Sequence, residues 1–168
     1  MLLDLVRLTW FPAIMAFAAS SDLLTMTISN RVSMLLVGGF LALALMSAMS
    51  PAEVLSHAGA GALVLVVSFG FFTRGWIGGG DAKLAAATAM WFGFGYLMNY
   101  LIYASLLGGA LTLLLIEFRL VPLPGLLAGQ FWAQRLHRQD GEIPYGIALA
   151  GAALLVYPDT PWMKVVGM

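Results

Sequence analysis

Apolar residues along this chain gather into six runs, which short polar or glycine-rich stretches separate. The runs cover residues 8–19, 32–49, 58–72, 84–98, 101–116 and 143–156. Most of them lack the alternation of apolar and polar positions that is typical of a half-buried strand. They predict six helices, several of which are shorter than the roughly 20 residues that cross a bilayer core. Such helices would need flanking residues, tilt or local thinning of the bilayer to span it.

The composition indicates that these helices lie in a membrane. Hydrophobic residues make up 61% of the 168 residues and charged residues 10%, and the mean hydropathy is +0.94. The charged share is far below the roughly 25% of soluble domains. Helices are the expected form because open sheets leave backbone groups unpaired in lipid. We therefore predict an all-α membrane protein with one domain, residues 1–168, built as a polytopic bundle of six transmembrane helices.

The absence of cysteine and the equal numbers of acidic and basic residues argue against several kinds of chemistry and partner. It has no cysteine, which rules out disulfides, thiolate zinc sites and a cysteine nucleophile. Eight basic residues balance eight acidic ones, so a nucleic-acid partner is not expected. We interpret residues 1–21 as the first membrane helix rather than a signal peptide, because acidic Asp4 precedes Arg7 and further apolar runs follow.

The basic residues predict an orientation in the membrane. Residues 119–142, with their prolines, aromatic and basic residues, are typical of an interfacial segment before the last helix. If the loop after the first run is cytoplasmic, most basic residues fall inside, as the positive-inside rule requires. Those inside are Arg31, Arg74, Lys83, Arg119, Arg135 and Arg138. Only Arg7 and Lys164 then lie outside, together with both termini, and the interfacial segment lies on the cytoplasmic side.

Two aspartates are predicted to lie at the same face of the membrane. Asp22 ends the first run and Asp81 begins the fourth, and the chain crosses the membrane twice between them. Apart from Glu117, they are the only acidic residues that directly adjoin a predicted helix core at that face. Because a carboxylate near the bilayer centre costs about 2.5 to 3.5 kcal/mol on insertion scales, such residues are functional candidates.

Each aspartate also has a structural interpretation. Asp81 follows three glycines and precedes an alanine-rich helix, so it is a natural N-cap. Three glycines exceed what a cap needs, however, and they would let another backbone, such as a peptide substrate, approach the carboxylate. Asp22 lies at a helix C-terminus, where the dipole disfavours a negative charge, so only solvation or pairing with Arg31 or Lys83 would explain it structurally.

Two carboxylates from separate helices fit a specific chemistry. When close together they cannot both ionise easily, so the pair shares one proton. The ionised member can take a proton from water while the protonated member polarises a peptide carbonyl, which is aspartyl proteolysis. We expect neither a metal nor another cofactor, because His57 and His137 fall on opposite sides of the membrane. Lys83 is interpreted as a substrate-orienting or phosphate-facing charge, or as a plain positive-inside anchor.

At these residues the chain resembles the type IV prepilin peptidases, particularly the short forms associated with Flp/Tad pili; archaeal preflagellin peptidases are close relatives. "GGGD", residues 78–81, matches the family's G-x-G-D motif, and Lys83 matches the lysine that commonly follows. "DLLTMTISN", residues 22–30, resembles the segment of the first aspartate, and "IPYGIALA", residues 143–150, resembles a segment that begins the last helix. The similarity spans nearly the whole chain.

The resemblance implies an aspartyl endopeptidase of the inner membrane that removes the short, basic leader of prepilins at the cytoplasmic boundary. It implies Asp22 and Asp81 as the catalytic pair, with the prepilin and the lipid bilayer as partners. The residues implied in support of the site are Gly78, Gly79, Gly80, Lys83, Asn30, Pro144, Tyr145 and Gly146.

The chain departs from the family pattern near the first aspartate. Ser29 stands where the family usually has proline, and Leu24 and Met26 replace residues that are often basic, so contacts to the substrate would differ there. The cysteine pairs of the long forms are not present, so N-methyltransferase activity is not implied.

An alternative of a different class is an ion or proton carrier that uses intramembrane carboxylates. It predicts a polar path through the bilayer, whereas both aspartates lie at one end of their helices.

Overall fold

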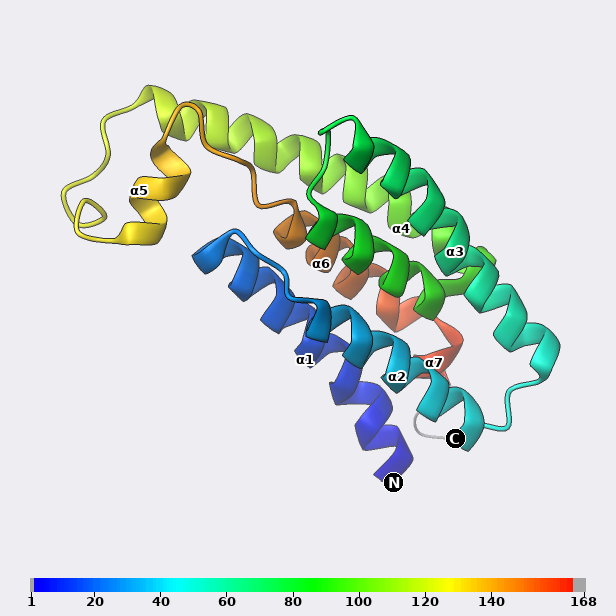
Figure 1. Ribbon diagram of the computed structural model, residues 1–168. Coiled ribbons are helices and arrows are strands. Elements are labelled where there is room, and N and C mark those ends of the chain that lie inside the picture. The colour runs from blue at the N-terminus through cyan, green and yellow to red at the C-terminus, as the bar shows by residue number, and fades with distance from the viewer. Residues whose placement is uncertain (1, 165–168) are drawn as a thin grey trace.

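A computed structural model describes residues 2–164, and within this range every regular element is a helix (Figure 1). The α-helices are α1 (Leu2–Thr25), α2 (Asn30–Met46), α3 (Pro51–Thr73), α4 (Gly79–Leu120), α5 (Phe131–His137), α6 (Tyr145–Val156) and α7 (Pro161–Lys164). A short 3-10 helix, η1 (Tyr157–Asp159), joins α6 to α7. The prediction of an all-helical fold is therefore confirmed for the described part of the chain.

Within residues 2–164, three helices are long and apolar enough to cross a membrane, namely α1, α3 and α4. Two further apolar stretches, Asn30–Met46 and Tyr145–Asp159, are shorter. Large apolar side chains are exposed on the outer faces of the bundle, among them Leu45, Val66 and Leu114. An apolar exterior of this kind suits a lipid environment, so the structure supports a membrane protein. The count of six spans stays a prediction.

The fourth and fifth predicted helices are both part of α4, and the boundary predicted between residues 98 and 101 is wrong. The chain instead breaks at Gly93, whose φ of 57° and ψ of −176° are not helical. From there the second half, residues 94–120, runs back along the bundle (Figure 1). Glycine tolerates this positive φ, and a Cβ there would lie 2.9 Å from the His57 ring.

Side chains from other helices satisfy the backbone carbonyls that the break leaves without helical partners. His57 Nδ1 of α3 donates to the Met90 carbonyl at 2.8 Å, and Trp162 Nε1 of α7 donates to the Trp91 carbonyl at 2.8 Å. His57 is thus a residue of α3 that packs against the break in α4. Because these bonds replace the missing helical ones, α4 can turn here without exposing polar groups.

A buried aromatic cluster joins the helices at the end of the bundle that holds η1 and α7. Phe11 stacks on Tyr157 with ring centroids 4.5 Å apart, and it lies 4.9 Å from Trp91. The Trp91 indole donates to the Leu36 carbonyl of α2 at 2.9 Å. The cluster thereby joins α1, α2, the first half of α4 and η1. These contacts fix the directions in which α1, α4 and α6 reach the opposite end.

Between α4 and α6 the chain forms an irregular segment with α5 at its centre, which projects to one side of the bundle (Figure 1). Arg135 of α5 donates to the Leu24 carbonyl at 3.1 Å. Arg119 at the end of α4 donates to the carbonyls of Leu136 at 2.9 Å and Glu142 at 3.0 Å. These bonds hold the segment against the ends of α1 and α4. Its predicted place at the membrane interface stays a prediction.

Candidate functional site

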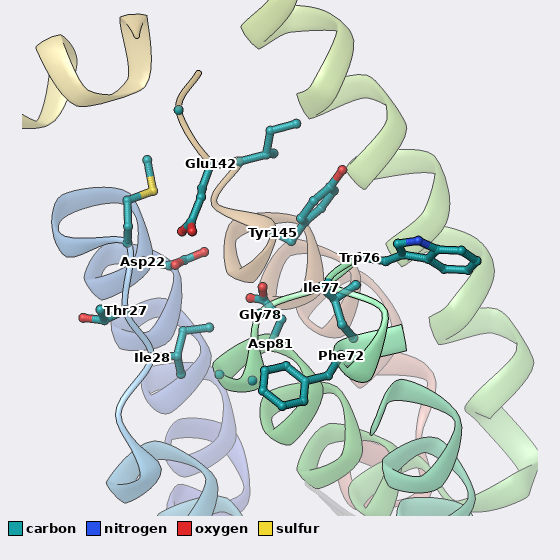
Figure 2. Close-up of a pocket in the computed structure, with 16 residues that line it drawn as sticks. Asp22, Thr27, Ile28, Phe72, Trp76, Ile77, Gly78, Asp81, Glu142 and Tyr145 are labelled. Carbon is teal, nitrogen blue, oxygen red and sulfur yellow. The ribbon is translucent and has the colours of Figure 1, made fainter. Parts of the chain in front are cut away.

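A pocket with a volume of about 650 Å³ opens where the C-terminal end of α1, the N-terminal end of α4 and the chain before α6 meet. Figure 2 shows the carboxylates of Asp22, Asp81 and Glu142 turned toward the same space. Phe72 and Ile77 add apolar wall on the side of α3. The two aspartates that are far apart in the sequence therefore reach one pocket, as their predicted common membrane face requires.

Asp22 lies in the last turn of α1, and its side chain is only 5% exposed. Its Oδ2 atom accepts a hydrogen bond of 2.7 Å from the backbone N–H of Gly146, in the first turn of α6. A helix N-terminus attracts negative charge, so α6 compensates for the unfavourable C-terminal dipole of α1. The alternative in which Asp22 pairs with Lys83 is not observed, because the Lys83 ammonium bonds Asn30.

Asp81 is the third residue of α4, and the N-cap is Gly78, so the N-cap position predicted for Asp81 is wrong. The Asp81 carboxylate reaches back and accepts a hydrogen bond from the Gly78 backbone N–H. This is the contact that an acidic residue makes in the second half of a capping box. It turns the carboxylate toward the pocket and leaves Asp81 half-buried.

The three glycines before Asp81 line the pocket and also allow close packing within the chain. A Cβ on Gly80 would lie 3.2 Å from both the Cβ and the carbonyl oxygen of Ile28, in the loop between α1 and α2. A Cβ on Gly79 would meet the Phe72 ring at 3.3 Å, and one on Gly78 would lie 2.9 Å from Asp81 Oδ2. The backbone that approaches Gly80 within the chain is that of Ile28, and all three glycines also line the pocket. That they let a substrate backbone approach Asp81 stays a prediction.

Lys83 and Asn30 form a pair with each other. The Lys83 Nζ atom donates to Asn30 Oδ1 at 2.8 Å, which ties the start of α2 to the start of α4. Neither residue lines the pocket. The structure thus places these two predicted supporting residues beside the site, where they position its helices.

The segment before the last predicted helix does reach the pocket. Pro144 is the buried N-cap residue of α6, and Tyr145 lines the pocket while its hydroxyl lies 3.2 Å from Thr112 Oγ1. Gly146 is in the closest contact: a Cβ there would lie 2.7 Å from Asp22 Oδ2 and 2.6 Å from Ile28 Cδ1. Only glycine fits at this position without displacing its neighbours.

Glu142 is a pocket residue that the sequence reasoning missed. It belongs to the predicted interfacial segment, residues 119–142, where no periodicity distinguishes one polar side chain from another. The available signal was its position directly before the segment of residues 143–150, which carries three predicted site residues.

Within residues 2–164, no three side chains of His, Cys, Asp or Glu are grouped so that they could hold a metal ion. A metal-free site remains an expectation.

A comparison with protein-family models matches residues 9–113 of the chain to the type IV leader peptidase family. The match covers more than half of the chain. The chain belongs to this family. The matched range contains both Asp22 and Asp81, whereas Glu142 and Gly146 come after it. Searches of curated proteins and of solved structures gave no match.

Proposed function

We propose that this chain is an aspartyl endopeptidase that removes the short, basic leader of a prepilin at the cytoplasmic boundary of the inner membrane. Membership of a leader peptidase family supports a peptidase with substrates of this kind. The single observation that carries the mechanism is the convergence of Asp22 and Asp81, from separate helices, on one pocket (Figure 2). These two residues are the proposed catalytic pair.

The proposed reaction uses one ionised and one protonated carboxyl group. The ionised member takes a proton from a water molecule, and the water oxygen attacks the carbonyl carbon of the scissile peptide bond. The protonated member donates a hydrogen bond to the carbonyl oxygen and stabilises the negative charge that develops there. Collapse of the tetrahedral intermediate then breaks the C–N bond, and the leaving amine takes up the proton that the first carboxylate received from water. The Gly146 N–H and the Gly78 N–H hold the two carboxyl groups in place for these steps.

The surroundings of the pocket support an action at the membrane boundary. Trp76, which lines the pocket, is exposed, and the Arg74 guanidinium lies 5.2 Å from the centre of its ring. Tryptophan is enriched at the headgroup level of bilayers, and basic residues are enriched on the cytoplasmic side. Arg119 and Arg135 lie at this same end of the bundle. We therefore propose that the pocket faces the cytoplasm and that both termini lie outside.

An ion or proton carrier receives less support from the arrangement of side chains. A carrier would continue the polar path from the aspartates through the bundle. Most buried residues on the far side of the pair are instead apolar, as Met15, Leu84 and Trp91 illustrate, although Arg7, Thr88 and Thr160 are buried as well. The buried Thr88 hydroxyl contacts the sulfur of Met15 at 3.9 Å, and the buried Tyr100 hydroxyl lies close to it.

The test of the proposed function is co-expression of this chain with a membrane-anchored prepilin, with leader removal scored by gel shift. We expect a smaller product when the wild-type chain is present. Edman sequencing or mass spectrometry of the product should place the new N-terminus directly after the leader. An unprocessed prepilin beside a well-expressed, membrane-inserted chain would contradict the proposal.

A further inference from the structure

The backbone around Glu142 is held in one place. Arg119 donates to the Glu142 carbonyl at 3.0 Å, and this bond attaches the segment to the end of α4. Next to it, a Cβ on Gly141 would lie 3.0 Å from the carbonyl oxygens of both Arg135 and Arg138, so the chain passes close to the end of α5. The Gly146 N–H bond to Asp22 fixes the other side of the same stretch. The segment therefore presents the Glu142 side chain to the pocket from a fixed position.

The Glu142 carboxylate itself has no partner among residues 2–164: it is exposed, and neither a hydrogen bond nor an ion pair reaches it within that range. Each nearby arginine is engaged elsewhere. Arg135 bonds the Leu24 carbonyl, and Arg138 forms a salt bridge of 2.9 Å with Asp140. A carboxylate on a fixed backbone, free of partners and turned into a pocket (Figure 2), is available to a ligand.

The charge of the pocket indicates which ligand group would suit it. Among the residues that the structure describes, three carboxylates line the wall, and none of the lining residues is a lysine, arginine or histidine. Asp22 and Asp81 have backbone donors and proposed catalytic roles, whereas Glu142 has neither. A peptide that enters the pocket displaces water from these acidic groups, and a cationic side chain would then replace the lost solvation.

We propose that Glu142 is a specificity-determining residue that binds a lysine or arginine side chain of the leader. The inference rests on the proposed function, and it names the part of the substrate that this side of the pocket recognises. Glu142 lies on the side toward α5 and the polar segment, away from the apolar interior of the bundle (Figure 2). The leader is the polar part of a membrane-anchored precursor, so it occupies this side while the apolar part follows the helices. The contact is a charge-assisted hydrogen bond, which discriminates a cation from a neutral side chain of similar size.

The experiment compares full-length wild type and Glu142→Gln on a series of membrane-anchored precursors. In each precursor one basic residue of the leader is replaced by glutamine, and kcat/KM for leader removal is measured in the same detergent or membrane preparation. We expect Glu142→Gln to lower kcat/KM about tenfold on the unmodified precursor, chiefly through KM. On the one precursor that lacks the recognised cation, wild type and variant should be equal. Asp140→Asn is the matched control, because Asp140 belongs to the same segment but pairs with Arg138 outside the pocket.

Charge reversal gives a second, positive readout. Glu142→Lys should cleave the unmodified precursor poorly and should regain activity when the recognised basic residue is changed to glutamate. An equal loss for Glu142→Gln on every precursor, or no loss on any, would overturn the assignment of Glu142, even though wild type still removes the leader. If wild type leaves all precursors intact, the proposed function itself fails, and the two outcomes are thereby distinguishable.

Discussion

The Oδ2 atom of Asp22 accepts a hydrogen bond of 2.7 Å from the backbone N–H of Gly146, and this bond joins the end of α1 to the start of α6. The bond needs a residue without a side chain, because Asp22 and Ile28 occupy the space that a Cβ would require. Three segments of the chain therefore meet at one point: the last turn of α1, the loop that follows it and the first turn of α6. Asp22 is held by the fold as a whole rather than by its own helix.

Gly146→Ala tests this arrangement. Its Cβ would lie 2.7 Å from Asp22 Oδ2, so the carboxylate or the start of α6 must move. We expect leader cleavage to fall by about 10²-fold, as for a misplacement of about 1 Å in a catalytic group, while the protein still inserts. Gly109→Ala is the control, because no atom lies within 4 Å of the added Cβ. Equal kcat/KM for both variants in a cleavage assay would contradict a strict requirement for glycine at residue 146.

Asp22→Asn and Asp81→Asn test the catalytic pair. Asparagine keeps the side-chain size, and its amide oxygen can still accept the bonds from Gly146 and Gly78. It cannot exchange a proton as a carboxyl group does, so each variant should lose about 10³-fold or more in cleavage. The double variant should be hardly worse than either single one, because the two groups act as a unit.

The control for this pair is the amount of inserted protein, which a tagged membrane fraction measures. A structural Asp81 would tolerate asparagine, and independent surface charges would give small, additive effects. Substantial cleavage by either single variant at wild-type abundance would remove that aspartate from the proposed active site.

Gly80→Val tests the contact between α4 and the loop after α1. Its Cβ would lie 3.2 Å from the carbonyl oxygen of Ile28, and the branched methyl groups would come closer still. We expect the loop to move, with a lower thermal stability and a larger loss of cleavage. Gly95→Val is the matched control, since no atom lies within 4 Å of a Cβ at Gly95. If both variants keep wild-type activity and melting temperature, the contact between Gly80 and Ile28 contributes neither to cleavage nor to stability.

Single cysteines test the proposed orientation, and the absence of natural cysteines makes the labelling specific. Ser29→Cys and Leu126→Cys replace exposed residues that we place inside, and Ala52→Cys replaces an exposed residue that we place outside. In intact cells an impermeant thiol reagent should label only Ala52→Cys. Permeabilised cells, in which all three should react, provide the control. Labelling of Ser29→Cys from outside would reverse the orientation.

Hydrophobic patterning predicted much of this fold, because each of the longer helices is a run of apolar residues that turn residues delimit, whereas α5 and α7 are not such runs. The parity of the crossings placed Asp22 and Asp81 at one face, and the pocket that both line agrees with it. The break at Gly93 was not predictable in this way. Residues on both sides of it are equally apolar, and the contact with His57 that accompanies the turn joins residues of two different helices.

The roles of individual site residues were harder to predict, because they depend on what packs beside them. In the sequence, the glycine at residue 80 indicates only that another backbone could approach it. The contact with Ile28 is visible only in the folded structure. Lys83 and Asn30 were both predicted near the site, yet their bond to each other is a tertiary contact that no local pattern contains. Glu142 depends on the path of an irregular segment, which periodicity does not describe.

The break in α4 also bears on how deep Asp81 lies in the membrane. At 1.5 Å per residue, residues 79–92 measure about 21 Å, which is less than the roughly 30 Å of a hydrocarbon core. A turn at that depth would strand carbonyl groups in lipid, but the bonds from His57 and Trp162 satisfy them. The distance between Asp81 and the break at Gly93 is therefore set by the first half of α4 and not by the thickness of the bilayer. In a bilayer of different thickness the lipid would adjust around the protein. The distance from the Asp81 carboxylate to the turn at Gly93 would stay the same.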